Sequence, residues 1–86
     1  MEPVPPFWFL QRQGKVERAG PDVLKLSAPN LKDAFIAISS SGQGTWYAAL
    51  RQSADSPDIA VTPAEFIKPE DAWQAAFELY RTHFVI

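Results

Sequence analysis

Apolar residues recur at helical spacing in two segments of the chain. The first stripe lies at i, i+3, i+4 and i+7 and consists of Leu31, Ala34, Phe35 and Ile38. This spacing places the four side chains on one face of an α-helix. Asn30 is a suitable N-cap for that helix, and Gly42, which follows three serines, is a suitable C-cap. The pattern therefore predicts a helix that begins near residue 31 and ends before residue 42.

The second stripe lies near the C-terminus and consists of Trp73, Ala76, Phe77, Tyr80 and Phe84. Pro69 fits the first turn of a helix because its φ is already helical and its missing N–H is not needed there. Glu70 and Asp71 follow at the positive end of the helix dipole. These residues predict a second helix from residue 69 onward.

Four short apolar segments bounded by turn residues are typical of β-strands, and they lie at residues 7–13, 23–27, 45–52 and 58–62. The elements then follow the order strand, strand, helix, twice. Both helical stripes need a common apolar surface, so the simplest fold is α+β with two layers. In this ββαββα arrangement, two helices cover one face of a four-stranded, mainly antiparallel sheet.

The two halves of the chain share this order of elements. Trp8 and Trp46 are 38 residues apart, and Asp33 and Asp71, each followed by alanine and an aromatic residue, have the same offset. Two copies of a short pattern indicate either an internal duplication or a chance similarity. We expect a single domain at 1–86 made of an extended proline-rich lead-in at 1–6, a first ββα unit at 7–42 and a second at 45–86.

Two predicted strands are apolar on both sides. A half-covered strand alternates apolar and polar residues, whereas residues 7–10 and 46–50 are apolar at both parities. The second side is then covered by the N-terminal segment, by Phe84–Ile86 or by another protein molecule, or it consists of singly exposed aromatics. Tryptophan and tyrosine are enriched at the energetic centres of interfaces. The predicted partner-binding residues are Phe7, Trp8, Phe9, Trp46 and Tyr47.

The charge pattern argues against nucleic acid as a partner. The chain has 8 Lys and Arg against 10 Asp and Glu, a net charge of −2, and its basic residues are spaced singly. The largest basic group, Arg12, Lys15 and Arg18, is diluted by Glu17 and is assigned to a solvated loop. With no apolar run of 18 residues and no signal-peptide pattern at the N-terminus, we expect no membrane association and a cytoplasmic location.

Candidate chemistry is sparse. The chain has no cysteine and one histidine, His83, so we expect no metal site and no cofactor. The glycine- and serine-rich segment 39–45 follows a predicted helix and lacks the lysine of a phosphate-binding loop, which indicates a connector. An enzyme could assemble a site from Arg51, His83 and aspartates of two chains at an oligomer interface, but we expect no enzyme.

These observations favour a small protein–protein interaction module, which homodimerises or docks on a larger protein through an aromatic sheet face. The alternative is a regulatory domain that binds a small molecule in a pocket between sheet and helices, which the aromatic content of 13% permits.

Overall fold

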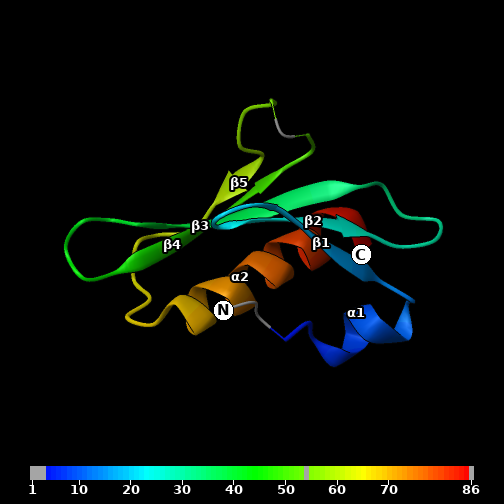
Figure 1. Ribbon diagram of the computed structural model, residues 1–86, viewed down its shortest axis with the longest axis horizontal. Helices are drawn as coiled ribbons and strands as arrows, with labels where there is room; N and C mark the ends of the chain where they lie inside the picture. The colour runs from blue at the N-terminus through cyan, green and yellow to red at the C-terminus, as the bar shows by residue number, and fades with distance from the viewer. Residues whose placement is uncertain (1–3, 54, 86) are drawn as a thin grey trace.

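The computed structural model describes residues 4–53 and 55–85 and shows an α+β fold. In chain order, the elements are α1 (Phe7–Gln11), β1 (Lys15–Gly20), β2 (Val23–Ser27), β3 (Ala34–Ser40), β4 (Trp46–Arg51), β5 (Ala60–Val61), α2 (Pro69–Tyr80) and the π-helical turn η1 (Arg81–Val85). The strands form one antiparallel sheet in the order β1-β2-β3-β4-β5. Both α1 and α2 lie on the same side of this sheet (Figure 1). The predicted α+β class and antiparallel sheet are confirmed.

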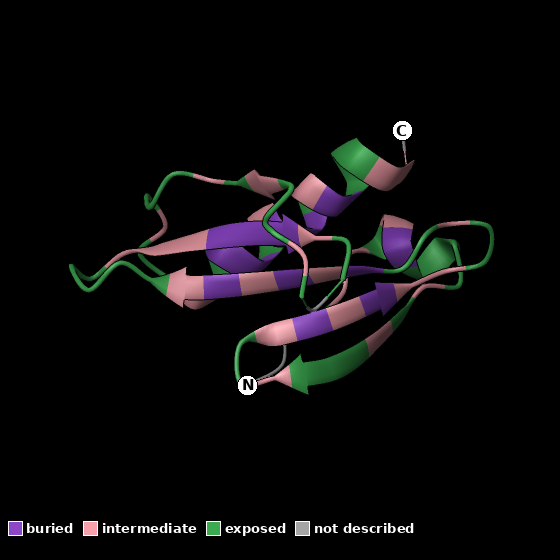
Figure 2. Ribbon diagram, turned by 90° about the horizontal axis from the view of Figure 1, so that it is seen from above, coloured by how far each residue is buried: buried purple, intermediate pink, exposed green. Residues whose placement is uncertain are grey.

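The core lies between the sheet and the two helices. Strand residues alternate between buried and partly buried along β2 and β3, as the banding in Figure 2 shows. This alternation follows from the pleat, which points successive side chains to opposite faces. The buried side chains on the helix-covered face are Leu24, Leu26, Ala34, Ile36, Ile38, Ala48 and Leu50.

Helix α2 covers β3 and β4. It begins at Pro69, as the sequence predicts, and has Glu70 and Asp71 in its first turn. The side chains it contributes to the core are Ala72, Trp73, Ala76, Phe77 and Tyr80. Among the described residues, no helix has the length and apolar character that a bilayer span requires.

The helix predicted over residues 31–38 is wrong, because these residues largely form strand β3. Ala34 and Ile38 fit both a helical spacing and a period of two, and Ile36 completes the strand period. The two isoleucines are β-branched and favour the extended backbone. Asn30 is not an N-cap but takes a left-handed conformation, with φ of 65°, in the connection before β3.

The strand predicted over residues 7–13 is also wrong, because residues 7–11 form α1. The Pro6 carbonyl accepts hydrogen bonds from the N–H groups of Phe9 and Leu10 and so starts the helix. Residues 15–20, which include the Lys15 and Arg18 assigned to a solvated loop, form strand β1. With β1 and β3 gained and the strand at 7–13 lost, the sheet has five strands rather than four.

These changes remove the predicted repeat. Residues 7–42 contain a helix followed by three strands, whereas residues 45–86 contain two strands followed by a helix. The two halves are therefore not two ββα units, and the similar residues at an offset of 38 do not mark an internal duplication. Residues 1–3 of the predicted lead-in, Ala54 and Ile86 lie outside the described residues.

Candidate interaction face of the sheet

The sheet face away from the helices carries an apolar row that crosses four strands. The registers pair Val23 with Ala37, Ala37 with Ala49, and Ala49 with Val61. Paired residues of antiparallel strands point to the same face, so these four side chains form one line across the sheet. We call them the apolar row.

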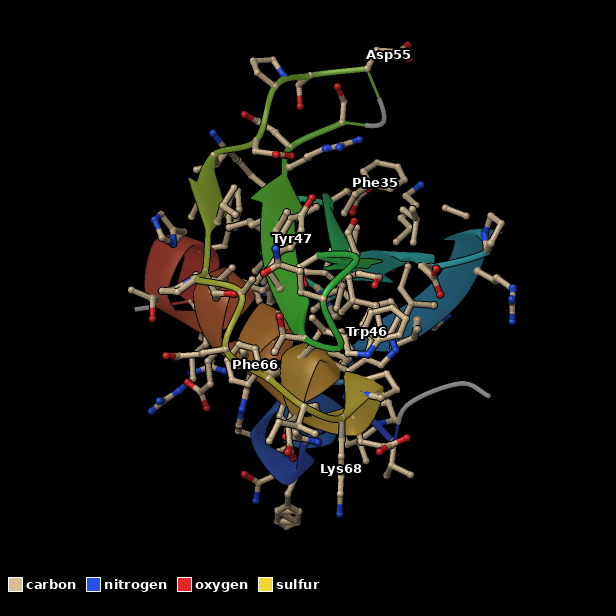
Figure 3. The ribbon with its side chains drawn as sticks, turned by 90° about the vertical axis from the view of Figure 1, so that its left-hand side faces the viewer. Phe35, Trp46, Tyr47, Asp55, Phe66 and Lys68 are labelled. Atoms are coloured by element: carbon tan, nitrogen blue, oxygen red, sulfur yellow. The ribbon has the colours of Figure 1, made fainter. Side chains whose placement is uncertain are left out.

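Two aromatic side chains flank the apolar row on opposite sides. Phe35 lies two residues before Ala37 on β3, and Tyr47 lies two residues before Ala49 on β4. Because β3 and β4 are antiparallel, the two rings stand on opposite sides of the row. Figure 3 shows Phe35 on the side of the sheet away from the helices. The apolar row, Phe35 and Tyr47 together are called the open face below.

Small residues occupy the centre of the open face, and larger ones surround it. Ala49 is only 6% exposed although it lies outside the core cluster under the sheet. Val23, Phe35, Ala37 and Tyr47 are partly buried, and Val61 is 51% exposed. The open face is thus a shallow apolar surface with alanines at its floor and rings beside them.

Charged residues at the margin of the open face are paired. The Arg51 Nε donates to Asp58 Oδ1 at 2.6 Å, which ties the end of β4 to the loop before β5. This loop rises on the open side of the sheet (Figure 1). Lys25 Nζ lies 3.6 Å from Asp33 Oδ2. Such pairs at the surface contribute little stability, but they keep both signs of charge beside the apolar residues.

The five predicted partner-binding residues do not share a sheet face. Phe7 is 69% exposed on α1, and Phe9, also on α1, is fully buried in the core. Trp8 packs against that core, and its ring stacks on Tyr80. The premise that these three lie on a strand is therefore wrong.

The other two predicted residues lie on β4 but point to opposite faces. Trp46 packs against the core and bridges to Phe66, whose carbonyl accepts from the Trp46 N–H at 2.7 Å. Figure 3 shows both rings lower than Phe35, toward the helix side of the sheet. Tyr47 is thus the predicted residue that the structure places on the open face. Sequence reasoning missed Phe35 and Ala37 because it assigned them to a helix.

The remaining candidates for chemistry are separate from one another. His83 Nδ1 lies 3.0 Å from the Leu79 carbonyl oxygen, on the turn that follows α2. The hydroxyls of Ser41 and Thr45 are 2.7 Å apart in the connection between β3 and β4. Within residues 4–53 and 55–85, no group of three or more His, Asp or Glu residues is placed to hold a metal ion.

Among the described residues, one buried polar side-chain atom has no hydrogen-bond partner. Tyr80 is fully buried, and its hydroxyl makes no hydrogen bond within the described chain. Burial, and secondarily the negative charge of Asp33, raises the pKa of the Tyr80 phenol above its ordinary value. This hydroxyl therefore stays protonated wherever the protein is folded near neutral pH.

Open clefts lie at the rim of the sheet, near the start of β1 and the end of β2. These clefts do not lie between the sheet and the helices, where the sequence predicts a small-molecule pocket. That pocket stays a prediction. No known family model matches the chain, and neither the curated proteins nor the solved structures give a significant match.

Proposed function

We propose that this chain is a non-enzymatic interaction module that forms a homodimer by packing the open face of one copy against that of another. The observation that carries the proposal is the apolar row, which runs unbroken across four strands on the face that the helices leave uncovered. An antiparallel sheet with one face against solvent normally carries polar residues on that face.

The chemistry of the apolar row suits a second copy of itself. Sheets that pack face to face stand about 10 Å apart and interdigitate their side chains. Ala37 and Ala49 at the centre of the row would let two sheets approach closely. Phe35 and Tyr47 would then fill the space on either side of the two stacked rows.

The flanking charges also fit a two-fold dimer. If the two-fold axis runs along the apolar row, Arg51 of one copy faces Tyr47 of the other, because Arg51 and Tyr47 lie on opposite sides of Ala49. If the axis runs along the strands between β3 and β4, Arg51 faces Phe35 of the other copy instead, since these two residues are paired in register. Both arrangements place a guanidinium over an aromatic ring, which is a favourable contact.

The open face is small, and this sets the affinity that we expect. A stable protein interface uses about 20–30 residues and about 800 Å² on each partner. The open face has six apolar residues, so a weak dimer is expected, with a dissociation constant of about 1–100 μM.

The test is sedimentation equilibrium from low micromolar to high micromolar concentration. We compare the native chain with Ala37→Lys and Phe35→Gln, which place polar groups on the open face, and with Phe7→Gln on α1 as the matched surface control. The native chain and Phe7→Gln should dimerise, and the two open-face variants should remain monomeric with an unchanged far-UV spectrum.

Two outcomes would contradict the proposal. A native chain that stays monomeric throughout the range would show that the open face does not bind a second copy, which would leave a different protein as its occupant. A dimer that Phe7→Gln disrupts, and that the open-face variants keep, would move the interface to α1.

A further inference from the structure

A shallow cleft in two adjoining parts lies at the end of the sheet, where the connection from α1 to β1 passes the connection from β2 to β3. Its two parts have volumes of about 310 and 470 Å³, and both are lined by Gln13 and Pro29. Both parts are wide open to solvent, so a small molecule bound there would stay partly exposed. The other lining residues are Gln11, Arg12, Lys15, Ser27, Ala28, Asn30 and Leu31. We call this the rim cleft.

The lining of the rim cleft is rich in hydrogen-bond donors and contains no carboxylate. Arg12 and Lys15 supply two positive charges, although the chain as a whole has a net charge of −2. Neither forms an ion pair with another described residue. Gln11, Gln13 and Asn30 add carboxamides, each with two N–H donors. This combination attracts an anion and can hydrogen-bond a polar body attached to it.

The backbone of the rim cleft is held in an unusual conformation on both sides. Among the described residues, the non-glycine residues with a left-handed backbone are Gln13, with φ of 59°, and Asn30, with φ of 65°. Both line the cleft, one from each connection. A non-glycine residue in this region costs about 1–3 kcal/mol, and such residues cluster at binding and catalytic sites. Asparagine tolerates it well, but glutamine does not share that tolerance.

The core fixes the connection that carries Gln13. The N–H of Gln13 donates to the Leu10 carbonyl at 3.0 Å, and the N–H of Gly14 donates to the Phe9 carbonyl at 3.0 Å. Gly14 also lies against the ring of the buried Phe9, where a Cβ would come within 2.5 Å of ring carbons. The backbone on this side of the rim cleft is thus fixed before any ligand arrives, while the side chains of Arg12, Gln13 and Lys15 are exposed to solvent.

We propose that the rim cleft binds a small polar molecule through a phosphate monoester. The two cations of the lining match the two negative charges of a phosphate monoester better than the single charge of a carboxylate. The planar guanidinium of Arg12 can bind two phosphate oxygens at once. Lys15 provides the second charge. The carboxamides of Gln13 and Asn30 and the hydroxyl of Ser27 then bind hydroxyl groups of the attached body. A sugar phosphate has this chemistry. None of its lining residues belongs to the open face, so this proposal does not rest on dimer formation.

The experiment is a titration of ¹⁵N-labelled protein with glucose 6-phosphate, followed by amide chemical shifts at constant ionic strength. Glucose and sodium sulfate serve as separate controls for the sugar and for a simple anion. The variant Arg12→Gln/Lys15→Gln removes both cations from the cleft, and Lys68→Gln, which lies at the start of α2, removes one charge elsewhere. The spectra also report whether each variant remains folded.

We expect saturable shifts in residues 11–15 and 27–31 with glucose 6-phosphate, at least tenfold weaker binding in the double variant, and no change in Lys68→Gln. Three outcomes would overturn the proposal: shifts that do not saturate, equal shifts with glucose alone or with sulfate, or unchanged affinity in the double variant. Equal shifts with glucose or sulfate would show that the phosphate monoester is not selected. Unchanged affinity in the double variant would show that Arg12 and Lys15 do not bind it.

Discussion

Trp8 of α1 stacks on Tyr80 in the last turn of α2, with ring centroids 6.4 Å apart and an interplanar angle of 15°. The guanidinium of Arg81 lies 6.0 Å from the centre of the Trp8 ring. Phe9 meets Tyr80 edge-on, with centroids 5.8 Å apart. These ring contacts join the two ends of the described chain, and they explain why Trp8 and Phe9 belong to the core more than to an interface.

The variant Trp8→Ala is expected to lose stability rather than self-association. Because Trp8 is partly buried, the lost ring contacts should lower the free energy of unfolding by about 2 kcal/mol, below the range for fully buried tryptophans. Urea denaturation measures this change, with Phe7→Ala as the exposed neighbour that should change it by less than about 0.5 kcal/mol. A Trp8→Ala protein of native stability that no longer dimerises would contradict this assignment.

The sequence predicts α2 well because it carries a single apolar stripe, and it predicts β2 and β4 because each is a short apolar segment between turn residues. Twelve residues of α2 hold one apolar stripe, with Pro69 marking its start. The segment Ala34–Ser40 defeats this reasoning because its apolar residues satisfy two periods at once. Pairing with β2 on one side and β4 on the other favours the extended backbone of this segment. The local sequence pattern contains no information about these neighbours.

Strand β1 and the open face are missed for related reasons. The segment Lys15–Gly20 is an edge strand whose residues are mostly exposed, so it lacks the alternation that marks a half-buried strand. The open face depends on the register of β2 to β5. Tyr47 is found from its residue type alone, whereas Phe35 joins it only once β3 is recognised as a strand.

A methyl group at Gly14 is expected to destabilise the fold. The Cβ of Gly14→Ala would lie 2.5 Å from two carbons of the Phe9 ring, which is itself fully buried and has little room to move. Overpacking of this kind costs about 1–3 kcal/mol. Gly20→Ala is the control, since its Cβ would meet Val23 at an ordinary 3.6 Å. Equal stability of the two variants in urea would show that Phe9 yields easily.

Removal of the buried Tyr80 hydroxyl is expected to change how stability depends on pH. The Tyr80 pKa is raised in the folded protein, so the unfolded chain loses the phenol proton near pH 10 while the folded chain still holds it. The unfolded state then binds fewer protons, and the stability of the native chain falls as the pH rises through 10. Tyr80→Phe lacks this contribution.

Chemical denaturation at intervals from pH 7 to pH 11 tests this difference. The lysines titrate in both proteins, so the difference between native and Tyr80→Phe isolates Tyr80. At pH 7 the variant should be equally stable or more stable by about 1 kcal/mol, because a buried hydroxyl without a partner is removed. Parallel curves up to pH 11 would mean that Tyr80 ionises as readily in the folded protein as in the unfolded chain.

Glycine at position 13 is expected to stabilise the protein and to weaken ligand binding at the rim cleft. Gln13 has a φ of 59°, a conformation that glycine adopts without the steric clash of a Cβ. Relief of that clash should raise the free energy of unfolding by about 1–2 kcal/mol. The greater conformational freedom of glycine in the unfolded chain should lower it by about 0.4–1 kcal/mol. Gln13→Gly should therefore unfold at a slightly higher urea concentration than the native chain.

The matched variant is Gln13→Ala, which removes the same carboxamide but keeps a Cβ in the left-handed conformation. It should gain no stability, and both variants should bind glucose 6-phosphate more weakly than the native chain because each lacks the carboxamide of a residue that lines the cleft. Equal stability of the two variants would show that the Gln13 backbone is not strained. Native affinity in both would remove Gln13 from the proposed site and leave the two cations as its binding groups.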